Sequence, residues 1–157
     1  MIQRIQTLFL SLVILFMAAF CVMNIWEKKS KTGNTTVSLN AFQMATTSDN
    51  IVINTQNTIW LAAIALVVIG LAAWSISQYK NRLRQMQIGF GISFMVSLLL
   101  GLIVYHERQA GSIIPDSAES TFGPGLIIPA LALIANMLAN KFIRQDEKMV
   151  RDADRMR

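Results

Sequence analysis

Residues 61–73 read LAAIALVVIGLAA, a run without one charged or strongly polar side chain. A helix in a soluble bundle needs a polar face, and this run has none at helical spacing. Extended outward, the uncharged stretch covers residues 58–79. A helix rises about 1.5 Å per residue and the hydrocarbon core is roughly 30 Å thick, so about 17–25 apolar residues suffice to cross it. The stretch therefore predicts a transmembrane helix.

Three further uncharged stretches cover residues 7–26, 88–105 and 123–140. A backbone in lipid must satisfy its own hydrogen bonds, and a helix does so within one segment. Hydrophobic residues make up 54% of the chain and charged residues 15%, against about 25% charged in typical soluble domains. We therefore predict an all-α membrane protein in which one domain, residues 1–157, contains four transmembrane helices.

The basic residues predict how the chain is oriented in the membrane. With both termini in the cytoplasm, only Lys28, Lys29, Lys31 and Arg108 lie outside. The three lysines follow the first span directly and locally favour the opposite orientation. The inner side nevertheless receives most of the positive charge, which predicts the N-in/C-in arrangement. The ten inner residues are Arg4, Lys80, Arg82, Arg84, Lys141, Arg144, Lys148, Arg151, Arg155 and Arg157.

Residues 27–57 are expected to form a small extracytoplasmic cap. The runs at 36–39 and 51–53 favour strands and flank a turn-forming segment at 46–50, which is compatible with a β-hairpin. A loosely ordered loop is the alternative, because a lone hairpin is marginally stable in water. Residues 106–122 contain Gly111 and Pro115 and predict a plain loop.

The third span places Gly89, Ser93, Ser97 and Gly101 on one helix face. Small residues let helices approach closely in lipid, so this stripe indicates packing within the bundle or contact with another protein or copy. Asn136 in the fourth span needs a hydrogen-bond partner on another helix, because an unpaired amide is costly in lipid. The candidate partners are Ser11, Ser75, Ser93 and Ser97.

The chain offers little for catalysis or ion coupling. No predicted span contains the charged residue that coupled transporters place in the membrane. An enzyme would have to use His106 with Glu107 or Asp116, but neighbours on a helix point in different directions. Nucleophile motifs, metal-ligand spacings and phosphate-binding loops are missing from the sequence. We therefore expect no enzymatic activity, metal or cofactor. The basic residues follow no nucleic-acid-binding motif, which excludes that class of partner.

Residues 141–157 read KFIRQDEKMVRDADRMR and are rich in helix formers. Glu147 with Arg151 and Lys148 with Asp152 are oppositely charged at i,i+4 spacing. The tail is expected to continue the fourth helix into the cytoplasm or to lie on the membrane surface. A solvated tail that only helps to set the topology is the simpler interpretation.

The opening residues 1–7, MIQRIQT, and the close 142–157, FIRQDEKMVRDADRMR, resemble an uncharacterised family, a domain of unknown function. Its members are small four-span inner-membrane proteins of Gram-negative bacteria. The resemblance implies a multi-pass protein of the bacterial inner (cytoplasmic) membrane and supplies no catalytic residue or ligand. It draws attention to the charged residues of both ends as a recognition surface. These are Arg4, Arg144, Asp146, Glu147, Lys148, Arg151, Asp154 and Arg155.

By elimination, we predict an accessory or scaffold subunit that docks a larger inner-membrane assembly through its cytoplasmic ends. Mixed charges at helical spacing suit specific protein docking, because complementary potentials set register and partner choice. The partners would be membrane lipid and either an inner-membrane protein or a second copy. The alternative is a small transporter or a lipid- or small-molecule-binding homo-oligomer, with Asn136 and Asn140 as its polar lining.

Overall fold

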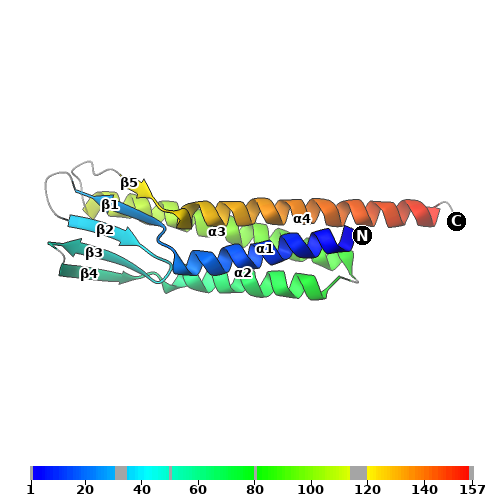
Figure 1. Cartoon of the computed structure of the whole chain (residues 1–157), viewed down its shortest axis with the longest axis horizontal. Helices are drawn as coiled ribbons and strands as arrows, with labels where there is room; N and C mark the ends of the chain where they lie inside the picture. The colour runs from blue at the N-terminus through cyan, green and yellow to red at the C-terminus, as the bar shows by residue number, and fades with distance from the viewer. Residues whose placement is uncertain (1, 31–34, 50, 80, 114–119, 156–157) are drawn as a thin grey trace.

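Four long helices run side by side, with a β-sheet at one end and both chain termini toward the other (Figure 1). The computed structural model describes residues 2–30, 35–49, 51–79, 81–113 and 120–155. The helices are α1 (Ile2–Val22), α2 (Ile59–Ser77), α3 (Arg82–Ile113) and α4 (Pro124–Arg155). Helix α4 extends past its neighbours at the end opposite the sheet.

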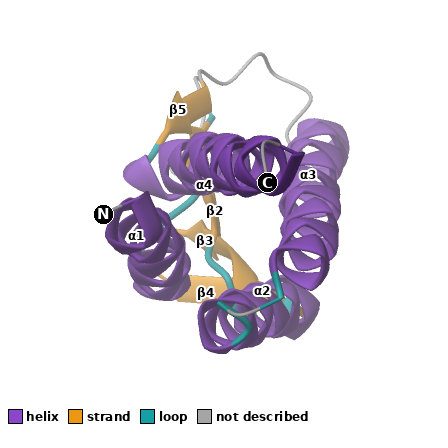
Figure 2. Cartoon of the chain, turned by 90° about the vertical axis from the view of Figure 1, so that its right-hand side faces the viewer, coloured by secondary structure: helices purple, strands orange, loops and turns teal. Residues whose placement is uncertain are grey.

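The helices form a ring in which α1 and α3 each contact both α2 and α4 (Figure 2). Its interior is mainly apolar and contains small residues such as Ala65, Ala72 and Ala139, which let the helices approach closely. Large apolar side chains also cover the outer surface of the bundle. Among them are Leu8, Leu15, Leu66, Val67, Trp74, Phe90, Phe94, Leu98, Val104, Ile127, Leu131, Ile134 and Met137.

An outer surface of this kind indicates a membrane protein, because lipid tails are as apolar as the side chains that face them. All four helices are long and apolar enough to cross a membrane. The predicted set of four apolar helices is thereby confirmed. The all-α class is only partly correct, because the described residues also form a five-stranded sheet.

Within the described residues, five strands form one antiparallel sheet in the order β4-β3-β2-β1-β5. The strands are β1 (Trp26–Lys29), β2 (Thr35–Leu39), β3 (Gln43–Ser48), β4 (Ile51–Asn57) and β5 (Ser120–Phe122). The predicted cap was at most a hairpin. A hairpin alone would be marginal, whereas three or more strands packed on an apolar surface are viable. Trp26, Val37, Leu39 and Met44 supply that packing and are buried.

Two predicted boundaries are corrected by this sheet. The first span was expected to reach Trp26, but α1 ends at Val22 and Trp26 opens β1. Residues 106–122 were expected to form a plain loop, but α3 continues to Ile113, and Ser120–Phe122 pair with β1 as β5. Pro115 lies outside the described residues.

Two glycines join the sheet to the start of α4. The Gly123 amide donates to the Ile25 carbonyl at 3.0 Å, and the Gly125 amide donates to the Asn24 carbonyl at the same distance. A Cβ atom on Gly125 would lie 2.6 Å from the Asn24 carbonyl oxygen, closer than van der Waals contact permits. The glycines therefore allow two backbones to approach where the α1–β1 link meets α4.

Candidate functional site

The small-residue stripe of α3 is used in two ways. Asn136 of α4 donates through Nδ2 to the Gly89 carbonyl at 2.7 Å and to Ser93 Oγ at 2.8 Å. A Cβ on Gly89 would collide with the Asn140 side chain, so α4 packs closely here. Ser97 and Gly101 are exposed, and a Cβ on Gly101 would meet nothing within 4 Å. One half of the stripe therefore binds α4 and the other half faces outward.

Each of the four helices also contributes a buried polar side chain to the bundle. These are Gln6 of α1, Ser75 of α2, Gln85 of α3 and Asn136 of α4. The two glutamines were not predicted as bundle residues because both lie just outside the predicted spans. Gln85 stands four residues before Gly89, so extending the third helix by one turn would have placed it on the same face.

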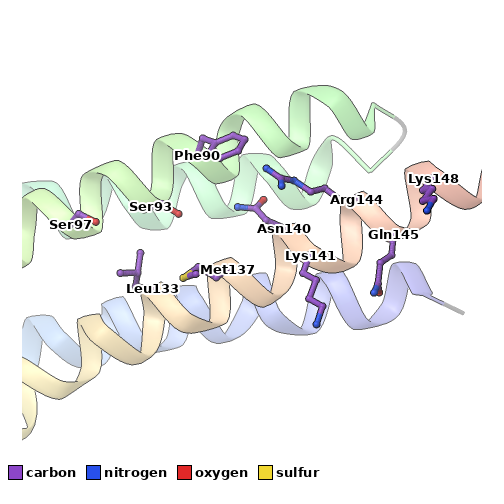
Figure 3. Close-up of a pocket in the computed structure, with 10 residues that line it drawn as sticks. All are labelled: Phe90, Ser93, Ser97, Leu133, Met137, Asn140, Lys141, Arg144, Gln145 and Lys148. Atoms are coloured by element: carbon purple, nitrogen blue, oxygen red, sulfur yellow. The ribbon is translucent and has the colours of Figure 1, made fainter.

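A groove of about 650 Å³ lies between α3 and α4 (Figure 3). Its character changes along its length. The end nearer the sheet is formed by small and apolar side chains, and the end nearer the C-terminus is formed by polar and basic ones. The first group is Phe90, Ser93, Ser97, Leu133 and Met137, and the second is Asn140, Lys141, Arg144, Gln145 and Lys148.

Contacts of charged residues hold the C-terminal part of α4 against α3. Arg82 Nη2 lies 3.0 Å from Asp146 Oδ2, and both side chains are largely shielded from solvent. Arg82 also donates to the Asp146 carbonyl oxygen at 3.4 Å. The Arg144 guanidinium lies 5.3 Å from the centroid of the Phe90 ring, a distance suited to a cation–π contact. These contacts hold the charged end of α4 next to the first turns of α3.

A second hollow, of about 500 Å³, adjoins the charged end of the groove. It is lined by Met86, Arg144, Glu147, Lys148, Arg151 and Asp152. Here Glu147 Oε1 lies 3.5 Å from Arg151 Nη2 on the next helical turn. In the described part of the chain, the other expected pair, Lys148 with Asp152, does not come within 4.0 Å.

The predicted recognition residues are thus distributed unevenly. Arg144, Glu147, Lys148 and Arg151 meet at the second hollow, whereas Asp146 is engaged by Arg82. The remaining three belong to α1 and α4, but their side chains lie outside the described residues; they are Arg4, Asp154 and Arg155.

At the opposite end, His106 packs as part of an aromatic cluster. It is 4% exposed, and its ring stacks on Trp60 with centroids 5.6 Å apart. Glu107 faces the sheet instead, with Oε1 3.9 Å from Lys28 Nζ, while Asp116 lies outside the described residues. Among described residues, no cluster of three or more His, Cys, Asp or Glu side chains could hold a metal ion.

Over residues 2–156 the chain matches the model of a family described as Domain of unknown function (DUF4293). This match confirms the resemblance to an uncharacterised family that the two ends of the sequence indicated. Comparison with curated proteins gives no match to the chain.

Proposed function

We propose, from the premise that the chain belongs to the DUF4293 family, that it is a non-catalytic accessory or scaffold subunit of a larger membrane assembly. It docks that assembly through its cytoplasmic ends. The observation that carries the proposal is the charged end of α4, which extends beyond the other helices (Figure 1). A helix that only crosses the membrane needs no such extension.

The proposal places the protein in the bacterial inner membrane as a multi-pass protein with both termini inside. The termini and the sheet lie toward opposite ends of the bundle, so those basic residues of the inner group that the structure describes fall on one side. The sheet end carries Lys28, Lys29 and Arg108. This asymmetry supports a cytoplasmic charged end and an extracytoplasmic sheet.

The second hollow and the α4 surface beside it are the proposed docking surface. Exposed Val150 lies three residues after Glu147, and exposed Met149 lies three residues before Asp152, so apolar area lies next to charged residues on the helix surface. Such a combination suits a protein partner, because apolar area contributes affinity and complementary charges select the partner. Asp146 is not part of this surface because Arg82 engages it.

A second candidate is a lipid- or small-molecule-binding protein or small transporter acting as a homo-oligomer. The 650 Å³ groove between α3 and α4 favours it, because grooves of this size hold small ligands in other proteins. Docking remains the main proposal because the groove alone does not account for the extension of α4.

A charge exchange tests the docking surface while preserving the local ion pair. In the variant Glu147→Arg/Arg151→Glu, the helix keeps an i,i+4 pair but presents its charges in reversed order. A photo-crosslinking residue at Val150 should form an adduct of defined mass in native membranes. We expect its yield to fall about tenfold in the exchanged variant, equivalent to ~1.4 kcal/mol of binding free energy.

The matched control exchanges the Glu27–Lys29 pair at the sheet end, as Glu27→Lys/Lys29→Glu. Its adduct yield should equal that of the unmodified protein. Docking would be refuted if the α4 exchange left the adduct yield unchanged, or if truncation after Phe142 left every co-purifying partner in place. Migration of the native protein alone, as a monomer, in mild detergent would refute it as well.

A further inference from the structure

The groove between α3 and α4 lies where the outer surface of α4 changes from apolar to basic. Met137 is 61% exposed, and one turn later the exposed side chains are Lys141 and then Arg144. In a helix that crosses a membrane, such a change marks the boundary between acyl chains and headgroups. The groove spans this boundary, with its apolar part on the membrane side and its basic part beyond it (Figure 3).

Three cations at the basic end have no carboxylate partner among the described residues. Lys141, Arg144 and Lys148 line the groove, and the described carboxylates lie more than 4.0 Å from them. The two nearest acids along the helix are engaged elsewhere, since Asp146 pairs with Arg82 and Glu147 with Arg151. The groove therefore presents uncompensated positive charge to an incoming ligand.

Arg144 is also oriented by its neighbour. The Phe90 ring supports the face of its guanidinium at 5.3 Å, and this contact leaves the N–H edges available. Those edges match the geometry of phosphate oxygens, which accept two parallel hydrogen bonds from a guanidinium. Asn140 lies between the apolar and basic parts, and its Oδ1 has no hydrogen-bond partner among the described groups.

We propose that this groove binds one anionic phospholipid from the cytoplasmic leaflet. An acyl chain lies along Met137 and Leu133 toward Ser97, and the phosphate lies among Lys141, Arg144 and Lys148. The distance along α4 from Leu133 to Lys148 is about 22 Å at 1.5 Å per residue. Half of a bilayer core is about 15 Å thick, so the groove reaches from the acyl region into the headgroup layer. Basic pockets between membrane helices on the cytoplasmic side hold acidic headgroups in this way.

This inference needs no protein partner, but it rests on the proposed orientation for its cytoplasmic side. Arg144 and Lys148 also line the second hollow, so the test uses purified protein, in which docking plays no part. Charge complementarity selects the ligand class. A zwitterionic lipid brings its own cation toward the three basic residues, whereas an anionic lipid such as phosphatidylglycerol does not. Free phosphate matches only the basic end and leaves the apolar end empty.

Native mass spectrometry of the full-length protein in a neutral detergent tests the site without a charged bilayer. Phosphatidylglycerol and phosphatidylcholine with the same acyl chains are added in competition. We expect about tenfold preferential retention of phosphatidylglycerol, since each basic side chain near an acidic headgroup favours binding. Lys141→Gln/Arg144→Gln/Lys148→Gln should abolish the preference. The control Lys29→Gln/Arg84→Gln/Arg108→Gln removes equal charge away from the groove and should retain it.

Two further arms test the apolar part and the phosphate source. Ser97→Phe should cause loss of retained phosphatidylglycerol, whereas Gly101→Phe, one turn away in open space, should not. Millimolar inorganic phosphate should leave the lipid in place. Equal retention of the two lipids, an unchanged preference in the groove variant, equal effects of the two phenylalanines or displacement by inorganic phosphate would each overturn the proposal.

Discussion

Replacing Trp26 by alanine is expected to lower the free energy of unfolding by about 3–5 kcal/mol, the range for removing a large buried aromatic side chain. Trp26 has an exposed fraction of 0% and opens β1 at the joint between helices and sheet. It is paired with Leu39 of β2 on one side and Phe122 of β5 on the other. Its loss would leave a cavity where two segments distant in sequence meet. Thermal unfolding followed by circular dichroism in detergent measures the effect.

The control is Trp74→Ala on the outer face of α2, where the indole is 54% exposed and detergent replaces it. Its melting temperature should stay close to that of the unmodified protein. Trp26→Phe should recover most of the loss, because Trp26 Nε1 has no hydrogen-bond partner among the described groups and a ring would still fill the space. Equal losses of thermal stability in Trp26→Ala and Trp74→Ala would show that Trp26 does not pack between the helices and the sheet as described.

A single methyl group at Gly125 is expected to destabilise the protein by about 1–3 kcal/mol, the usual cost of overpacking. In Gly125→Ala, the new Cβ would lie 2.6 Å from the Asn24 carbonyl oxygen and 2.9 Å from the Ile25 Cα. Both obstacles are backbone atoms, so relief requires the α1–β1 link to move away from α4. The hydrogen bond from the Gly125 amide to Asn24 would then be strained as well. The melting temperature in detergent reports the loss.

Gly70→Ala on α2 is the matched control, because a Cβ there would meet nothing within 4 Å. Alanine is the better helix former by about 1 kcal/mol, so this variant should be as stable as the unmodified protein or more stable. Opposite signs for the same chemical change at two glycines are the expected result. A stabilising Gly125→Ala would show that the two backbones do not approach as described.

The helices could be predicted from the sequence, but most of the sheet could not. Uncharged blocks reveal the four helices because the membrane requires length and apolarity from each segment alone. The strands depend on one another, and β5, with three residues, carries no signal until β1 lies beside it. Trp26 was assigned to the end of a span because an aromatic residue at the end of an apolar run resembles an interface anchor. Its burial depends on strands far along the chain.

For the candidate sites, the sequence indicated several of the residues but not how they are arranged in space. The resemblance of the charged tail to the uncharacterised family drew attention to Arg144 and Lys148. The groove that both residues line depends on how α3 packs against α4, which helical periodicity does not specify. The Arg82–Asp146 pair joins positions 64 residues apart, and it converts a predicted recognition residue into an internal contact. Local spacing revealed the Glu147–Arg151 pair because its partners lie one turn apart.

The orientation of the protein in the membrane decides whether the charged end of α4 meets cytoplasmic partners and lipids. In a Cys21→Ala background, single cysteines at exposed Asn54 of β4 and at exposed Met149 of α4 report the two ends. Spheroplasts are treated with a membrane-impermeant maleimide before and after permeabilisation. The account predicts that Asn54→Cys reacts in intact spheroplasts and that Met149→Cys reacts only after permeabilisation. The reverse order, or reaction of both cysteines in intact spheroplasts, would contradict it.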